Sequence, residues 1–231
     1  MDFAQILYRD EQLLVLNKPS GMLVHRGWAR APRVLTDLVR ELGGGRTAYT
    51  VHRLDRATSG VIVFALDQPT AAALNRDFDC GAVRKHYIAL VRGRAPDSGV
   101  IDYPIPARKP DGERVPALTE FRLLQFLELE PRELSLVEAL PRSGRLHQVR
   151  RHLRHIDHPL INDSNYGDTK LNRAISQRWG LNRLGLHSAV LELTHPTSGE
   201  RLTIRAPLPD DLAAPLSRMG FELDGLKVLR A

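Results

Sequence analysis

The stretch VHRLDRATSGVIVFAL, residues 51–66, joins a charged loop to a run of apolar residues. Its second half, residues 60–66, combines β-branched and aromatic side chains, which is typical of a buried β-strand. Asp67 follows and can cap a helix, because its carboxylate accepts hydrogen bonds from the unpaired N–H groups of a first helical turn, where Pro69 also fits. The sequence therefore predicts a buried strand that leads into a helix running toward Gly81.

Outside this stretch, short apolar runs separated by turn residues dominate the chain. A helix is expected over 34–42, ended by the glycine run 43–45. Further strands are predicted at residues 6–8, 13–16, 83–92, 118–129, 134–140, 190–194 and 201–206. The run 118–129 is expected to pair with 134–140, and the run 190–194 should form a hairpin with 201–206.

These elements indicate an α+β fold with a mixed, mainly antiparallel β-sheet and flanking helices. Residues 93–117 are rich in proline, glycine and charge, so we expect them to form a surface excursion. The segment gives no firm domain boundary, and we predict a single domain over residues 1–231.

Composition restricts the classes of function. The single cysteine, Cys80, excludes an internal disulfide and argues against a thiolate metal site. Charges in the N-terminal residues and the lack of a long apolar run argue against a secretory leader or a membrane span, so a cytoplasmic protein is expected. A formal net charge of +6 suits a polyanionic partner, although it is weak evidence alone.

Much of the positive charge falls in RSGRLHQVRRHLRHIDH, residues 142–158. Apolar residues recur there at helical spacing, and five arginines and four histidines accompany one acid: the apolar positions are Leu146, Val149, Leu153 and Ile156. Such a helix could attract a phosphate backbone, or it could be a solvated amphipathic helix without a ligand. The histidine spacing also invites a metal site, which we disfavour because Pro159 ends the helix and no Cys or Glu completes a ligand set.

The loop at 51–58 places Asp55 between Arg53 and Arg56. Neighbouring cations favour the ionised carboxylate, which can attack an electrophilic carbon or accept a proton. From this segment alone, a surface loop with salt bridges is the preferred interpretation, because Asp beside Arg is common. No second acid is paired with Asp55, which argues against glycosidase-type hydrolysis and favours chemistry with one carboxylate.

Five segments together resemble the RluA-type family of pseudouridine synthases. They are LNKPSGMLVH at 16–25, VHRLDRATSG at 51–60, KHY at 85–87, SGRLHQVRRHL at 143–153 and HPLINDSNYGD at 158–168. Their order and spacing agree with the family over nearly the whole chain. The pair Arg150-Arg151 and the run at 164–188 resemble one branch more narrowly, the TruC-type tRNA pseudouridine synthases, which modify the uridine at position 65 in the T stem. One departure is Ala57, where the family commonly has proline.

The resemblance implies a role for each matching residue. Asp55 is implied as the essential carboxylate, by attack on C1′ of the ribose or by abstraction of the 2′ proton. Arg150 is expected to pair with Asp55, and Tyr87 is expected to stack on the flipped uracil. Arg53 is expected to fill the space that the base leaves. Phosphate contacts are expected from three further arginines of the basic segment: Arg145, Arg151 and Arg154.

Other histidines and one lysine have weaker assignments. Lys85 and His52 match the family motifs but can be structural, and His187 and His195 are interpreted as structural histidines of the C-terminal sheet region.

The reaction implied by the resemblance is an isomerisation that needs no cofactor and no metal. Neither a dinucleotide-binding glycine motif nor a P-loop occurs in the sequence. The expected partner is tRNA, with no membrane, no obligate protein partner and a monomeric state, and the extra N-terminal RNA-binding (S4) domain of some relatives is expected to be absent. Two alternatives stay open: the same chemistry on ribosomal RNA, or a non-catalytic RNA-binding module with this fold.

Overall fold

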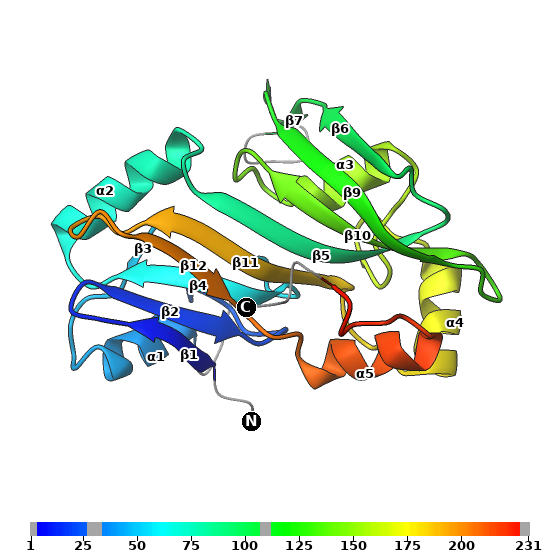
Figure 1. Ribbon diagram of the computed structural model, residues 1–231, viewed down its shortest axis with the longest axis horizontal. Helices are drawn as coiled ribbons and strands as arrows, with labels where there is room; N and C mark the ends of the chain where they lie inside the picture. Colours follow the sequence, from blue (N-terminus) through cyan, green and yellow to red (C-terminus); the bar gives the residue numbers. More distant parts are fainter. Residues whose placement is uncertain (1–3, 27–33, 107–111, 227–231) are drawn as a thin grey trace. The chain divides into compact units, whose positions relative to one another are not determined.

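The computed structural model describes residues 4–26, 34–106 and 112–226 (Figure 1). Within these ranges the chain forms twelve strands and five helices, and the α+β prediction is confirmed. The described residues make up two compact units. The first contains the described residues of Met1–Arg84 and Ser188–Pro207, and the second contains the described residues of Lys85–His187 and Leu208–Ala231.

The first unit is built on a mainly antiparallel sheet. Its strands lie in the order β1-β2-β4-β11-β12, and β3 pairs with β4. The bounds are β1 Gln5–Arg9, β2 Leu13–Lys18, β3 Tyr49–Thr50, β4 Ser59–Ala65, β11 Leu186–Thr194 and β12 Arg201–Arg205. All seven residues of β4 are buried, as its apolar composition predicts, and β2 pairs with it in antiparallel register from Leu13 opposite Ala65 to Lys18 opposite Gly60.

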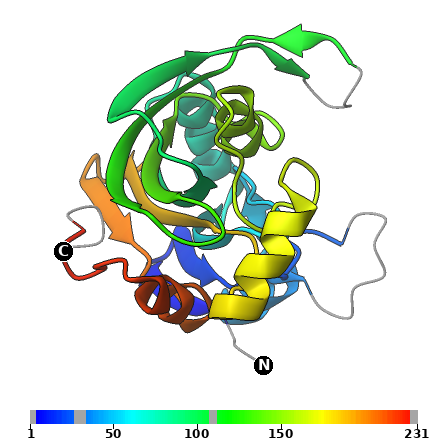
Figure 2. The same ribbon diagram turned by 90° about the vertical axis from the view of Figure 1, so that its right-hand side faces the viewer.

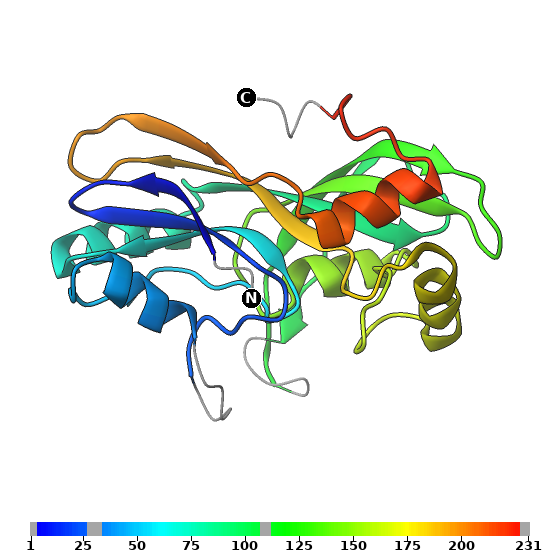
Figure 3. The same cartoon turned by 90° about the horizontal axis from the view of Figure 1, so that it is seen from below.

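Two helices lie on the same side of this sheet, α1 at Leu35–Leu42 and α2 at Gln68–Asp79 (Figure 3). The predicted cap of α2 is confirmed, because the Asp67 carboxylate accepts a hydrogen bond from the N–H of Thr70 at 2.8 Å. The helix packs Ala71 and Leu74 into the hydrophobic core of the unit. Strand β4 and helix α2, which lie on either side of Asp67, thus hold the charged loop at 51–58 in position.

The second unit has an antiparallel sheet in the order β5-β10-β9-β6, which curves around α3 (Figure 2). The predicted pairing of the two central runs is confirmed, with Leu134 opposite Leu127 and Pro141 opposite Thr119. The bounds are β5 Arg84–Arg92, β6 Ser98–Asp102, β7 Ile105–Pro106, β8 Arg114–Val115, β9 Leu118–Leu127, β10 Leu134–Pro141, α3 Gln148–His155, α4 Thr169–Trp179 and α5 Asp210–Met219.

Two expectations for this unit are corrected. Residues 93–117 are not simply a surface excursion, because they contain β6, which pairs with β9, and the short hairpin of β7 and β8, with Ile101 and Ile105 buried. Residues 107–111 of that segment lie outside the described residues. The basic helix is shorter than 142–158, because α3 begins only at Gln148, after His147 in a left-handed conformation with φ of 53°.

None of the helices within the described ranges is long and apolar enough to cross a membrane.

Candidate active site

Asp55 lies in a tight turn immediately before β4. The N–H of Thr58 donates to the Asp55 carbonyl at 3.1 Å, which closes the turn. The Asp55 side chain is half-buried, and the neighbouring Arg53 and Arg56 are exposed. Burial, together with the positive charge of Arg53, lowers the pKa of His25, so Arg53 lies close enough to influence that ring.

Lys18 holds this turn against the segment that follows β2. Its side chain is fully buried, and Nζ donates to the carbonyls of Pro19, Met22 and Arg56 at 3.0, 2.9 and 3.1 Å. A buried ammonium group requires such acceptors, because a charge removed from water is costly unless hydrogen bonds replace the lost hydration. The carbonyl of Arg56 lies directly after Asp55 in the chain, so Lys18 fixes the backbone beside the carboxylate.

The Ser20 hydroxyl adds a second connection between the two loops. It donates to the carbonyl of Ala57 at 2.8 Å, and the N–H of Gly21 donates to the carbonyl of Arg56 at 2.8 Å. Ala57 is therefore anchored through its backbone at the position where the family commonly has proline.

Gly60 lies at the end of the loop, at a position where only glycine fits. Its φ is +114°, and a Cβ placed on it would lie 2.1 Å from the carbonyl oxygen of Ser188 in β11. No side chain fits at that distance, so the backbones of β4 and β11 approach closely only because residue 60 is glycine.

His52 has a structural role in the same loop. Its Nε2 accepts a hydrogen bond from the N–H of Val63 at 3.0 Å, and its ring stacks on Phe78 with 4.6 Å between centroids. His195 likewise donates from Nε2 to Asp10 at 2.9 Å and is buried, which agrees with the structural interpretation of that residue.

In the second unit, Tyr87 and Lys85 lie two residues apart on β5 and share one face of the strand. Tyr87 is half-buried. Lys85 is buried, donates from Nζ to the carbonyl of Ser143 at 3.0 Å, and has its pKa lowered to about 8 by burial. This contact connects β5 to the SGR segment that precedes α3.

Gln148 organises that segment. Its Oε1 accepts hydrogen bonds from the Ser143 hydroxyl at 2.7 Å and the N–H of Arg145 at 3.1 Å, and its Nε2 donates to the carbonyl of Leu118 at 2.9 Å. These bonds hold residues 143–147 in a loop, which is the physical reason why the helix predicted from the apolar spacing starts later than expected.

Arg150 is buried and forms a two-pronged ion pair with Asp163. Its Nε donates to Oδ2 at 2.7 Å and its Nη2 donates to Oδ1 at 2.8 Å. Burial alone would raise the pKa of Asp163, but the hydrogen bonds and charge of Arg150 outweigh it and hold that pKa below its usual range. The predicted pairing of Arg150 with Asp55 stays a prediction, because the two residues belong to different units.

Tyr166 lies beside both members of the arginine pair. Its hydroxyl accepts a hydrogen bond from Nε of Arg151 at 2.8 Å, and it lies 3.0 Å from Nδ1 of His147. The guanidinium of Arg150 lies 5.1 Å from the centre of the Tyr166 ring. The neighbouring arginines therefore differ: one is buried against a carboxylate, and Arg151 is half-buried and held by a hydroxyl.

The other predicted phosphate contacts are exposed. Arg145 and Arg154 both face solvent, and Arg154 makes a 3.2 Å contact with Asp157. The histidines of the segment have protein partners: His152 contacts Thr119 and the Tyr103 carbonyl, each at 2.9 Å, and His155 stacks on Tyr103. Within the described ranges no group of three metal-ligating side chains comes together.

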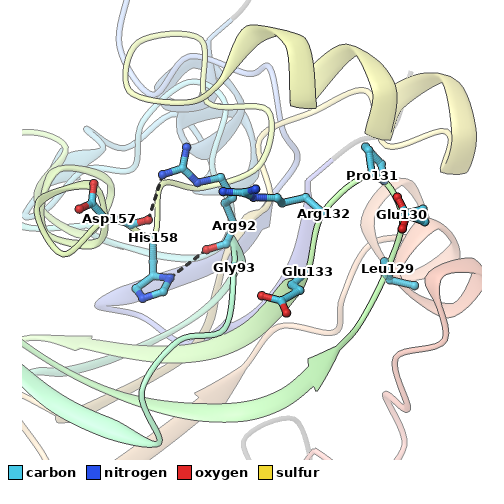
Figure 4. Close-up of a pocket in the computed structure, with 9 residues that line it drawn as sticks. All are labelled: Arg92, Gly93, Leu129, Glu130, Pro131, Arg132, Glu133, Asp157 and His158. Atoms are coloured by element: carbon cyan, nitrogen blue, oxygen red, sulfur yellow. Dashed lines mark hydrogen bonds between the residues drawn. The ribbon is translucent and has the colours of Figure 1, made fainter.

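A groove of about 790 Å³ in the second unit is a competing location for a site (Figure 4). It is lined by Arg92, Gly93, Leu129, Glu130, Pro131, Arg132, Glu133, Asp157 and His158. Its charges are mixed, with Arg92 already donating to the Asp157 carbonyl at 3.2 Å, and none of the residues given a catalytic, substrate or phosphate role by the family resemblance lines it. We therefore assign it no catalytic role.

The RNA pseudouridylate synthase family matches residues 12–155, which is more than half of the chain. The chain belongs to this family. The resemblance to RluA-type pseudouridine synthases is thereby confirmed, and the matched region contains the Asp55 turn, β5 with Tyr87, and α3 with Arg150. As a family member, the protein is an isomerase.

Curated relatives in the family agree over most of the chain. The tRNA pseudouridine synthase C of Yersinia pestis is 37% identical over 94% of this chain and 91% of its own length. That of Pectobacterium carotovorum subsp. carotovorum is 41% identical over 87% of this chain, which spans 58% of the length of that protein. Among solved structures, human RNA pseudouridylate synthase domain containing 4 matches with a TM-score of 0.77 and 30% identity, covering 94% of both chains.

Two buried residues of this pseudouridine synthase carry contacts that sequence reasoning did not assign, Lys18 and Asp163. Both fall inside segments that resemble family motifs, LNKPSGMLVH and HPLINDSNYGD. The available signal was a charged residue within an otherwise apolar or turn-rich motif. Of the partners, Arg56 lies 38 residues from Lys18 and Arg150 lies 13 residues from Asp163 in the chain.

Proposed function

We propose that this protein isomerises uridine to pseudouridine in tRNA, at position 65 in the T stem. The observation that supports it most is the identity of 35–41% with relatives named tRNA pseudouridine synthase C, most of them matched over nearly their whole length. The position follows from the resemblance to the TruC-type branch, carried by Arg150-Arg151 and the run at 164–188.

In this proposal Asp55 supplies the essential carboxylate. The bond from ribose C1′ to uracil N1 breaks, the base turns, and C5 bonds to C1′. C5 then loses its proton and N1 gains one, so the RNA neither gains nor loses atoms overall and no redox partner is needed. The fixed turn around Asp55 supports the role, because a carboxylate that attacks C1′ or takes the 2′ proton must be held in one orientation.

Arg150 and Tyr87 complete the proposed chemistry. A buried guanidinium with a fixed plane can hold a carboxylate ionised and oriented, which is the role the family resemblance gives to Arg150 toward Asp55. Tyr87 presents an aromatic ring on which uracil can stack, and its hydroxyl can receive the C5 proton late in the reaction.

The target uridine of a stem must leave the base stack, at a cost of a few kcal/mol. Arg53 is exposed at the edge of the Asp55 turn, which supports its proposed role of occupying the vacated space. Arg145, Arg151 and Arg154 are proposed to contact phosphates, which position the RNA without reading its sequence.

We predict that changing Arg151 and Arg154 together to alanine weakens tRNA binding and flattens its salt dependence. Each lost phosphate contact lowers the slope of log K against log salt by about 0.9. The measurement is the Kd for tRNA over a series of salt concentrations. Changing Arg40 and Arg76 to alanine is the matched control, since both are exposed helical arginines in the first unit. An unchanged slope in the first double variant would show that α3 does not face the RNA.

Mapping the modified uridine tests the substrate. The purified protein is incubated with unmodified tRNA and, separately, with ribosomal RNA, and pseudouridine is located by chemical labelling and sequencing. We expect one new pseudouridine in the T stem of tRNA and none in ribosomal RNA. Modification of ribosomal RNA alone would support the alternative substrate, and RNA binding without product would support a non-catalytic module.

A further inference from the structure

The loop between α3 and α4 carries Asp163, which has no part in the reaction proposed so far. Its side chain is completely buried, and the Arg150 side chain that it contacts is 7% exposed. Both carboxylate oxygens take part in this two-pronged ion pair, which we call the fork. Oδ2 lies 2.7 Å from Nε and Oδ1 lies 2.8 Å from Nη2. This edge-on contact fixes the guanidinium plane, and it leaves Nη1 as the nitrogen outside the fork.

Asp163 is itself held rigidly by its own loop. Its Oδ1 also accepts the N–H of Asn165 at 2.9 Å and of Tyr166 at 3.1 Å, and its carbonyl accepts the N–H of Gly167 at 3.0 Å. A Cβ on Gly167 would lie 2.5 Å from that carbonyl oxygen, so the loop is packed too closely for a side chain there. The carboxylate therefore cannot turn without breaking the loop.

The ring of Tyr166 packs against the Arg150 guanidinium. The Arg150 guanidinium carbon lies 5.1 Å from the ring centre, within the range of a cation–π contact. The carboxylate restricts rotation within the plane of the guanidinium, and the aromatic ring restricts tilting of that plane. Arg150 thus has much less freedom than a surface arginine.

We propose that Asp163 is a positioning residue that sets the orientation of the Arg150 guanidinium for the isomerisation. The inference rests on the proposed function, in which Arg150 holds the Asp55 carboxylate ionised and oriented. If the Arg150 side chain were free to move, it would still be charged and could still attract RNA. It would, however, hold the Asp55 carboxylate in many orientations. Asp163 therefore contributes to turnover and contributes little to RNA affinity.

The test is a double-mutant cycle with Asp163→Asn, Arg150→Ala and the variant with both changes. Asparagine keeps the shape of the side chain and removes its charge and one acceptor oxygen. We expect Asp163→Asn to lower kcat by about 10- to 100-fold, since a misplacement of about 1 Å can cost on the order of 100-fold. KM for tRNA should stay within about threefold, because phosphate contacts dominate RNA affinity.

The decisive readout is whether the two changes are additive. If Asp163 acts only through Arg150, adding Asp163→Asn to Arg150→Ala lowers kcat no further. Glu138→Gln is the matched control, because Glu138 is also a buried carboxylate that pairs with an arginine, Arg122, and lies on the face of the sheet opposite Tyr87. We expect this control to lower the melting temperature and keep kcat.

Three results would overturn the inference while wild-type protein still forms pseudouridine. They are an unchanged kcat in folded Asp163→Asn, an unchanged kcat in Arg150→Ala, or fully additive losses. If Asp163→Asn does not fold, Arg150→Lys decides, because lysine keeps the charge and cannot form the fork. Wild-type kcat in Arg150→Lys would overturn the inference, and a loss of kcat at unchanged KM would support it. Absence of product from wild-type protein would instead refute the proposed function.

Discussion

Replacing Asp55 with asparagine is expected to abolish pseudouridine formation while leaving tRNA binding nearly intact. Asparagine keeps the shape of the side chain but cannot attack C1′ or accept the 2′ proton. We expect the rate to fall by at least about 10³-fold, within the range that one acid–base group contributes. The Kd for tRNA should change by less than about tenfold, or ~1.4 kcal/mol. Single-turnover assays of pseudouridine content and a binding titration measure the two quantities.

Asp79→Asn is the control for this prediction. Asp79 is an exposed aspartate at the end of α2 in the same unit, so its replacement removes an equal charge without touching the Asp55 turn. The control should keep wild-type activity. Product formation by Asp55→Asn at the wild-type rate would remove Asp55 from the chemistry and leave the turn with only a structural role.

Replacing Gly60 with alanine is expected to lower the free energy of unfolding by more than about 3 kcal/mol. Two costs combine: backbone strain of about 1–3 kcal/mol and overpacking of about 1–3 kcal/mol. The overpacking arises because the new Cβ would lie 2.1 Å from the Ser188 carbonyl oxygen, which is backbone and cannot turn away. Urea denaturation of the purified variant measures the change.

Gly44→Ala separates the two costs. Gly44 also has a positive φ, +70°, but nothing lies within 4 Å of the position its Cβ would take. Only backbone strain applies there, so we expect a loss of about 1–2 kcal/mol. Equal losses in the two variants would show that the close approach of β4 and β11 has no cost of its own.

Local patterns predicted most of the secondary structure, because they depend on residues close together in the chain. The buried β4, the Asp67 cap of α2 and the pairing of β9 with β10 all follow from apolar runs and turn residues. The start of α3 did not follow, since the apolar spacing from Leu146 continues through residues that Gln148 holds in a loop. The edge strand β6, with the sequence SGVID, was missed because it lies within a segment rich in proline, glycine and charge.

Prediction of the candidate site from the sequence has a different limit. Motif resemblance singled out Asp55, Tyr87 and Arg150 as candidates, since each lies in a short segment typical of the family. The partners that hold these segments were not predictable, because spacing within a motif does not give the direction of a side chain. Asp163 reaches Arg150 only through the fold of the α3–α4 loop, and Lys18 reaches the Arg56 carbonyl only because β2 pairs with β4.

The buried ammonium group of Lys18 resembles a monovalent cation in a cage of three peptide oxygens, with the difference that this cation is tethered to the chain. Because the ammonium group is covalently bound to the chain, dilution cannot remove it from these oxygens. A chelator cannot extract it, and a change in the ions of the medium cannot exchange it. The conformation of the Asp55 turn is thereby uncoupled from the ionic conditions that would control RNA binding by the arginines of α3 under the proposed function.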